Sequence, residues 1–320
     1  MGATHTVDIT EPKPFGISYG KMMMWFFILS DALTFSGFIT AYAFSRFKFI
    51  ESWPLPDEVF NHFPFMHGDN PMYFVALMTF ILIFSSVTMV LAVDAGHKMQ
   101  QKKVILYMFL TIIGGAMFVG SQAWEWKNFI SGHNGAVITK GGNVLQFVKA
   151  DSKKERVSIH DLVDGHAAHG DRVQHESKNG LWFVNEAPLP EYTKADIVKA
   201  FNANPNVVIK TETIVNNEKV VLSREDSAEA LKDMKNVVFG ANLLENEYGK
   251  PLFADFFFFI TGFHGFHVFS GIVFNIIIFF NIILGTYERR GHYEMVEKVG
   301  LYWHFVDLVW VFVFTFFYLV

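Results

Sequence analysis

Two histidines in a long apolar stretch are the residues best placed to do chemistry in this sequence. His264 and His267 lie in segment 261–271, which reads TGFHGFHVFSG, inside the almost wholly apolar stretch 253–284. Successive helical residues are rotated by about 100°, so positions three apart project from the same side of a helix. Ionisable groups in hydrocarbon are costly unless they face a partner, so this side is predicted to face protein.

A carboxyl group in the first apolar stretch is predicted to lie at a similar depth. Asp31 is near the middle of stretch 22–44. A rise of about 1.5 Å per helical residue places it level with His264, near the membrane midplane. Asp31 could exchange protons as a buried carboxyl, or its hydrogen bonds could simply fix helix packing. The structural role is the favoured interpretation.

Three further ionisable residues lie towards the ends of apolar stretches. His304 and Asp307 are near the start of stretch 300–320, and Glu125 lies between two tryptophans near the opposite interface, where aromatic residues are common. His304, Asp307 and the histidine pair offer nitrogen and oxygen ligands for a metal ion. The histidines are too few for a membrane di-metal oxidase, so hydrogen bonding between helices is the favoured role.

A second histidine-rich segment, 159–176, reads IHDLVDGHAAHGDRVQHE. His166 and His169 have a spacing compatible with a divalent metal ion. A solvated, acidic loop has the same composition, and this is the favoured interpretation.

Composition excludes several classes of function. The 320 residues are 51% hydrophobic and include 37 Phe, which is typical of a chain that lies partly in a membrane. There is no cysteine, so disulfides, thiol catalysis and thiolate metal sites are excluded. The net charge of -5 gives no basic surface for nucleic acid.

Five apolar stretches are long enough to cross the roughly 30 Å hydrocarbon core of a membrane as helices. The sequence therefore predicts an all-α polytopic membrane protein with a bundle of five transmembrane helices. The stretches are 22–44, 72–93, 104–126, 253–284 and 300–320.

The polar segment 127–252 is predicted to be a small α+β soluble domain inserted between the third and fourth helices. Two strand-like runs on either side of Asn216 and Asn217 predict a β-hairpin. Runs 135–149 and 179–187 predict further strands, and Thr193 and Ser227 are the predicted N-caps of two helices.

Charge in the short loops predicts the orientation. Loops 95–103 and 285–299 contain lysine and arginine, which indicates that both lie in the cytoplasm. The N-terminal lead 1–20, which has no signal peptide pattern, is then cytoplasmic. The C-terminus and the inserted domain are predicted on the periplasmic side of a bacterial inner membrane. The membrane domains would be 21–126 and 253–320, separated by 127–252.

Four motifs in the predicted helices are long enough to suggest a family. The first helix contains WFFILSDALTFSGF, the third ends in QAWEW, the fourth contains TGFHGFHVFSG and the last contains YWHFVDLVWVFVF. Together they resemble subunit III of the haem–copper oxidases, specifically of cytochrome c oxidase. The resemblance covers 15–130 and 250–320, and it implies a five-helix form that lacks the first two helices of the seven-helix subunit.

Each of these motifs implies candidate site residues in this sequence. Asp31 takes the place of the buried Glu in the family's SE motif, a departure that shortens the side chain by one methylene. Glu125, His264 and His267 match the family's Glu and its paired histidines. The other matching positions are Trp303, His304, Asp307 and Trp310 in the last helix, and Thr261, Gly262, Gly265 and Gly271 as small packing residues in the fourth.

The resemblance implies an accessory subunit of a proton-pumping cytochrome c oxidase, which passes electrons from cytochrome c to O2. Such a chain would bind no haem or copper, because haem a and copper would lie in the partner subunits. It would pack on oxidase subunits I and II, hold phospholipid and help to sustain proton uptake. Segment 127–252 has no counterpart in the common subunit, and we expect it to dock an electron-donor cytochrome or a neighbouring respiratory complex.

Three other functions are compatible with parts of the sequence. A quinol oxidase of the same superfamily has a subunit III with similar motifs, and only the redox centres of subunit II separate the two. A stand-alone proton-coupled transporter could use Asp31 and the histidines as a relay, but the paired repeats and broken helices of such transporters are not found. A membrane metalloenzyme is disfavoured by the number of ligands.

Overall fold

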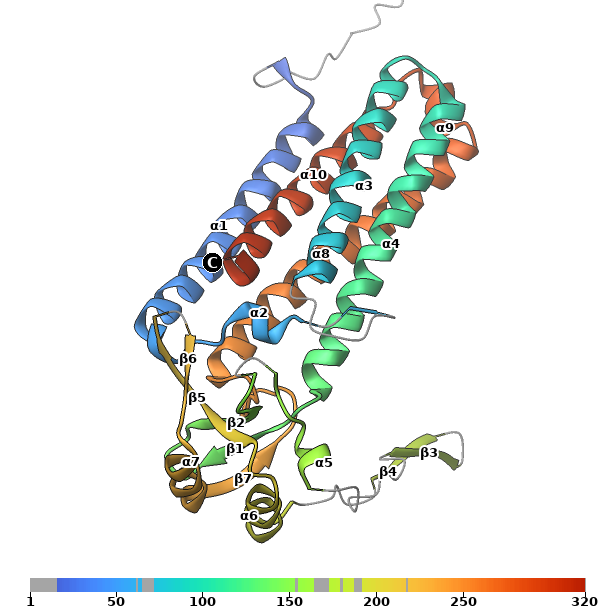
Figure 1. The fold of residues 1–320 in the computed structure, drawn as a ribbon. Coiled ribbons are helices and arrows are strands. Elements are labelled where there is room, and N and C mark those ends of the chain that lie inside the picture. Colours follow the sequence, from blue (N-terminus) through green and yellow to red (C-terminus); the bar gives the residue numbers. More distant parts are fainter. Residues whose placement is uncertain are drawn as a thin grey trace, which may run out of the picture. The chain divides into compact units, whose positions relative to one another are not determined.

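The computed structural model describes residues 16–61, 63–64, 72–152, 155–163, 173–178, 181–186, 192–216 and 218–319. Within this part of the chain, five helices are long and apolar enough to cross a membrane, which confirms the predicted membrane protein with five spans. They are α1 (Tyr19–Lys48), α3 (Tyr73–His97), α4 (Gln101–Ser131), α8 (Pro251–Ile283) and α10 (Glu294–Phe314), which continues as a π-helix at Thr315–Leu319 (Figure 1).

The helices differ from the predicted spans mainly at their ends. α1 begins three residues before and ends four residues after the predicted 22–44, and α4 also extends at both ends. The predictions followed the apolar residues alone. Polar residues beyond the apolar run can continue the backbone hydrogen bonding of a helix, so hydropathy underestimates helix length.

The chain forms two compact units. The first contains the described residues up to Ala41 together with Ala76–Ser121 and Ile260–Phe316. The second contains Tyr42–Val75, Gln122–Phe259 and the end of the chain from Phe317. The second unit therefore combines the sheet region with the adjoining ends of the long helices.

Close helix packing in the first unit depends on glycine. A Cβ atom at Gly115 would lie 2.5 Å from the Trp303 ring, and one at Gly271 would lie 3.0 Å from the same ring. The Trp303 indole N–H donates a hydrogen bond of 3.2 Å to Ser85 Oγ. The indole is thus enclosed by three helices and its polar atom has a partner, as a buried tryptophan requires.

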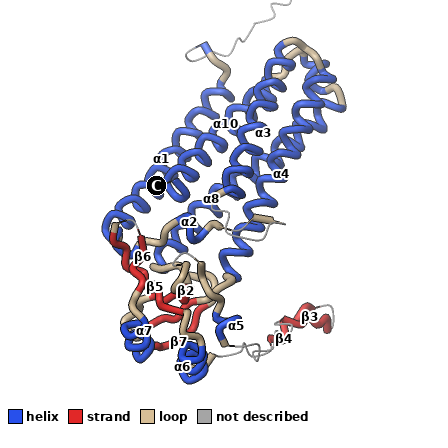
Figure 2. Tube along the Cα trace, in the orientation of Figure 1, coloured by secondary structure: helices blue, strands red, loops and turns tan. Residues whose placement is uncertain are grey.

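The second unit contains a five-stranded antiparallel sheet with the strand order β6-β5-β2-β1-β7 (Figure 2). Its strands are β1 (Ala136–Thr139), β2 (Val144–Lys149), β5 (Val207–Val215), β6 (Glu218–Val221) and β7 (Met234–Val238). A separate two-stranded sheet contains β3 (Val173–Lys178) and β4 (Leu181–Glu186). The short helices are α2 (Pro56–Val59), α5 (Ile159–Leu162), α6 (Lys194–Ala203), α7 (Arg224–Ala230) and α9 (Thr286–Arg290), with 3-10 turns at Ile50–Ser52 and Leu231–Asp233.

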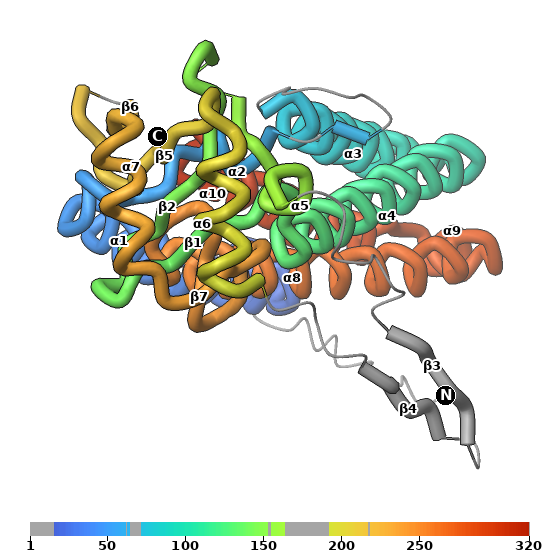
Figure 3. The backbone as a smooth tube through the Cα atoms, turned by 60° about the horizontal axis from the view of Figure 1, so that its bottom comes forward, coloured from blue at the N-terminus to red at the C-terminus, as the bar shows by residue number. Residues whose placement is uncertain are grey.

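The five-stranded sheet is buried on both faces, and the two faces differ in chemistry. Helices α6 and α7 lie along one face (Figure 3), which is apolar, and Phe147 and Ile209 of the sheet form a core there with Phe201 of α6. On the neighbouring strand positions the other face carries buried polar residues, Gln146 and Lys210 among them. Because side chains alternate along a strand, the sequence VVIKTE in β5 places Ile209 and Lys210 on opposite faces.

The sheet region confirms some predictions and corrects one. β5 and β6 form the predicted hairpin, with Asn216 in its turn at a φ of 54°. Thr193 caps α6 as predicted. Ser227 is not an N-cap: α7 is capped by Ser223, whose side chain accepts the Asp226 N–H. Ser227 instead lies inside the helix.

Candidate functional site

Asp31 on α1 and His267 on α8 form a buried pair in the first unit. His267 Nδ1 lies 2.7 Å from the Phe263 carbonyl oxygen, which can only accept, so Nδ1 carries a hydrogen. His267 Nε2 lies 3.2 Å from Asp31 Oδ2. A hydrogen bond between these two atoms needs one more proton, on Nε2 or on Oδ2. The pair can therefore hold one shared proton.

Aromatic rings surround this pair. The Phe35 ring centroid lies 5.4 Å from that of His267, and the Phe263 centroid lies 4.6 Å away. The side chains of His267 and Asp31 are only 9% and 16% exposed in the chain alone. The proton shared by the pair is therefore largely screened from water by this chain's own side chains.

His264 has a different partner from His267, although both lie on α8. Its Nε2 lies 3.1 Å from the Val306 carbonyl oxygen on α10 and donates to it. Its ring packs 5.1 Å from the Trp310 ring and 5.7 Å from the Phe118 ring, measured between centroids. Of the two histidines, His267 is the one that contacts Asp31.

His304 and Asp307 lie on α10 near Ser86 of α3. His304 Nδ1 is 2.6 Å from Ser86 Oγ, and the Ser86 hydroxyl also lies within hydrogen-bond reach of Asp307. These contacts tie α10 to α3, as the predicted role in helix packing requires. Among the residues that the structure describes, no three histidine or carboxylate side chains gather as a metal site. His166 and His169 lie outside the described residues.

Glu125 is a buried carboxyl in the second unit. Its side chain accepts two hydrogen bonds of 2.9 Å at Oε2, one from Gln122 Nε2 and one from the Tyr318 hydroxyl. Its relative exposure is 5%, so it is far less accessible than the predicted interfacial position implies. Gln122 lies three residues before Glu125 on α4, so this contact could have been predicted from helical spacing. Tyr318 could not, since it is distant in sequence.

The packing residues predicted in the fourth helix behave differently from one another. Thr261 is fully buried, and Gly271 lies against the Trp303 and Tyr302 rings. Gly262 is half-buried. Nothing in the described chain lies within 4 Å of a Cβ built at Gly265, so close packing at this residue remains a prediction about a partner chain. Trp310 is buried, with its indole N–H donating to Thr79 Oγ1 at 2.9 Å.

The second unit contains a buried charge cluster that was not predicted from the sequence. The Glu58 carboxylate on α2 lies 2.5 Å from Lys210 Nζ and 2.8 Å from Lys219 Nζ. The two lysine side chains are 7% and 2% exposed. Burial alone would raise the pKa of Glu58, but the attraction of Lys219 and Lys210 outweighs it, so the pKa is below its ordinary value. Lysine in a β-strand gave no sequence signal for this pairing.

Comparison with known proteins relates parts of this chain to one family. The family model described as cytochrome c oxidase subunit III matches residues 247–320, which contain α8 and α10. Cytochrome c oxidase subunit 3 of Thermostichus vulcanus is 30% identical over 155 residues, which cover 42% of this chain and 73% of that protein.

Other relatives match shorter regions. Probable cytochrome c oxidase subunit 3 of Rickettsia prowazekii is 40% identical over 76 residues, covering 23% of this chain and 27% of that protein. Cytochrome c oxidase subunit 3 of Marchantia polymorpha is 44% identical over 64 residues, 20% of this chain and 24% of that protein. The chain thus matches about a quarter of the length of these relatives, whereas the Thermostichus match extends over most of that protein. The chain therefore belongs to the cytochrome c oxidase subunit III family.

Proposed function

We propose that this chain is the accessory subunit III of a proton-pumping cytochrome c oxidase. In this role it packs on oxidase subunits I and II, which carry the haem a and copper that reduce O2 to water. The chain itself contributes no redox centre. The observation that carries the proposal is the family match over residues 247–320, which include both α8 histidines and the α10 motif.

The Asp31–His267 pair is proposed to hold a proton close to the subunit contact and to help sustain proton uptake during turnover. Support comes from the geometry of the pair, which accommodates one shared proton between two largely buried side chains. Asp and His are a suitable combination because either side chain can carry the proton of the hydrogen bond between them. Phospholipid is the proposed ligand of the apolar helix surfaces.

The orientation follows from the basic loops. We propose that loops 95–103 and 285–299 face the cytoplasm of a bacterium, and that the C-terminus and segment 127–252 face the periplasm. Segment 127–252 is then on the side where soluble electron donors arrive. Its proposed partner is an electron-donor cytochrome or a neighbouring respiratory complex.

Isolation of the tagged chain from its own membranes in mild detergent tests the function. We expect co-purifying oxidase subunits in a mass-spectrometric partner analysis and haem a bands in the reduced-minus-oxidised spectrum. Oxidation assays with reduced cytochrome c and with quinol then separate the two kinds of oxidase. A colourless chain that purifies alone would contradict the proposal.

A further inference from the structure

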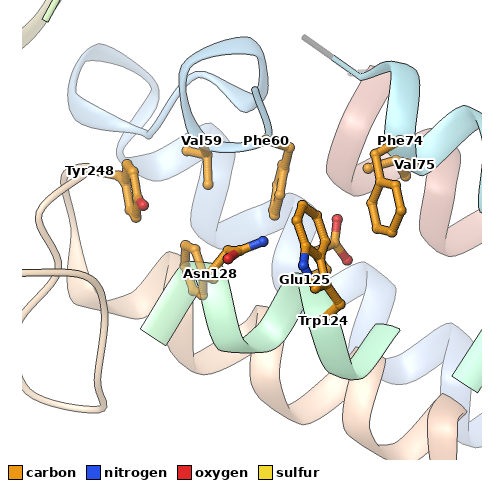
Figure 4. A pocket seen from close by; sticks show the side chains of 9 residues that line it. Val59, Phe60, Phe74, Val75, Trp124, Glu125, Asn128 and Tyr248 are labelled. Carbon is orange, nitrogen blue, oxygen red and sulfur yellow. The ribbon is translucent and has the colours of Figure 1, made fainter. Parts of the chain in front are cut away.

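The second unit contains a small cavity next to Glu125. Its volume is about 20 Å³, measured as the space open to the centre of a water molecule. Figure 4 shows Trp124, Glu125 and Asn128 of α4 directed towards this space. Apolar side chains make up most of the remaining lining: Val59, Phe60, Phe74, Val75, Phe129 and Tyr248.

Two polar atoms at this cavity are buried without a hydrogen-bond partner among the described residues. They are Glu125 Oε1 and Asn128 Nδ2. The other carboxyl oxygen of Glu125 already accepts from Gln122 and Tyr318. One of the two unpartnered atoms is a hydrogen-bond donor and the other can accept. Burial of both without partners costs free energy, so this place in the structure calls for a bridging group.

The dimensions fit a single water molecule. A polar cavity needs roughly 10–15 Å³ of such space to hold one water, and the cavity at Glu125 exceeds this. Glu125 and Asn128 are three residues apart on α4, so their side chains leave the same side of the helix. A water between them can accept from the Asn128 amide and donate to Glu125 Oε1.

We propose that Glu125 and Asn128 bind one water molecule in this cavity, which makes the site a hydrated carboxyl buried beside the sheet region. A hydrated carboxyl of this kind can pass a proton to or from its water, whereas a dry one cannot. The inference rests only on the second unit, so it holds whether or not the chain is an oxidase subunit.

Segment 127–252 and the loop before α3 supply two walls of this site. Tyr248 stacks on Phe129 with ring centroids 5.3 Å apart and an interplanar angle of 9°. The preceding residue, Glu247, is fixed by hydrogen bonds from the backbone N–H groups of Gly135 and Gly240 and by Arg156. The Tyr248 wall is therefore held by buried polar contacts of the sheet region.

The second wall is held by the charge cluster. Val59 and Phe60 follow Glu58 directly, and Glu58 is bound by Lys210 and Lys219 of the sheet. Phe60 also packs on Tyr318, with ring centroids 4.5 Å apart. The sheet lysines thus bind the residue that directly precedes Val59 and Phe60 in the lining of the cavity.

An electron cryomicroscopy map of the purified full-length protein, with whatever partners it retains, tests the proposal at a resolution that shows ordered water. We expect one water peak within hydrogen-bond distance of both Glu125 Oε1 and Asn128 Nδ2. A map without this peak, or with the Asn128 amide bonded directly to Glu125, would overturn the inference.

Two variants extend the test. Asn128→Leu removes the donor and fills the cavity, so the water peak should be lost. Glu125→Gln keeps the shape of the side chain, with its amide oxygen accepting from Gln122 and Tyr318 and its amide N–H directed to the cavity. A water there can accept from this N–H and from Asn128, so the peak should remain. A peak that persists in Asn128→Leu would show that Asn128 does not bind the water. If either variant fails to fold, the map of the unaltered protein still decides the question.

Discussion

At the scale of single residues, the Asp31–His267 pair shows how two ionisable side chains can be accommodated in the middle of membrane helices. Each provides the other's hydrogen-bond partner, and the pair needs only one proton between Nε2 and Oδ2. A carboxyl or imidazole buried alone at this place would lack such compensation. The proposed proton-holding role thus falls on the same two atoms that link the two helices, and substitution can separate the two roles.

Asp31→Asn keeps the shape of the side chain but cannot release a proton. We expect assembly and initial oxidase activity to be largely retained, with a changed pH profile or a faster loss of activity during turnover. Turnover followed over time at several pH values is the measurement. Asp94→Asn is the matched control, because Asp94 is exposed and pairs with Lys98 one turn away. If Asp31→Asn matches the unaltered protein in both respects, the carboxyl is only structural.

Gly115→Ala should destabilise the first unit. The new methyl group would meet the Trp303 ring at 2.5 Å, and overpacking of this kind costs about 1–3 kcal/mol. Gly120→Ala is the control on the same helix, since no atom of the described residues lies within 4 Å of a Cβ there. Thermal unfolding in detergent, followed by tryptophan fluorescence, should give a lower Tm for Gly115→Ala only. Equal Tm values for the two variants would contradict the tight packing.

At the scale of elements, the prediction of helices from sequence succeeded because the physical signal is local. A run of about twenty apolar residues is sufficient to identify a spanning helix. The start of α7 was misjudged because Ser223 and Ser227 are both capable N-caps, and only the packing of the sheet selects Ser223. The partners of buried polar groups were not predictable, since Asp31 and His267 are 236 positions apart and their contact depends on tertiary packing.

The ion pairs of Glu58 should make the attachment of α2 to the sheet dependent on pH. The pKa of Glu58 is lowered from its ordinary value of 4.5 because Lys219 and Lys210 outweigh the effect of burial. A lowered carboxyl pKa contributes stability that is fully present above the ordinary value and is lost as the pH falls through the lowered one. Hydrogen exchange of peptides from 50–60 and 207–215 should accelerate in that acidic range, after correction for intrinsic rates. In the Glu58→Gln variant, the same peptides should exchange faster already at neutral pH, and their exchange should show no further acceleration in the acidic range.

Loss of the same ion pairs should expose Glu125. Glu58→Gln leaves Lys210 and Lys219 without their carboxylate and loosens the adjacent Val59 and Phe60 wall. We expect a water-soluble carbodiimide with an amine nucleophile to label Glu125 several-fold faster in this variant, as measured by peptide mass spectrometry. Glu155→Gln, which removes an exposed ion pair with Lys149, is the control and should leave labelling unchanged. Equal labelling in all three proteins would show that the ion pairs do not limit access.

At the scale of the whole molecule, the segment between α4 and α8 contains a sheet of its own. The two ends of that segment lie next to each other. Ala241 N–H donates to the Phe129 carbonyl at 3.0 Å, and a Cβ at Gly132 would lie 2.1 Å from Gly240 N. The polypeptide therefore leaves α4 and returns at almost the same point. An insertion with adjacent ends can be removed with little change to the elements that flank it.

Direct linkage of Gly132 to Gly240, with residues 133–239 removed, should leave the five long helices able to fold and to assemble with their partners. Glu58→Gln should be included, because the deletion also removes both lysines that neutralise Glu58. If the segment docks an electron donor or a neighbouring complex, affinity purification should retain the oxidase subunits and lose that partner. The variant that carries Glu58→Gln without the deletion is the matched control, and it should still co-purify with that partner. An unchanged partner set in the deletion variant would show that the segment is not a docking domain, and its main role would then be to cover Glu125.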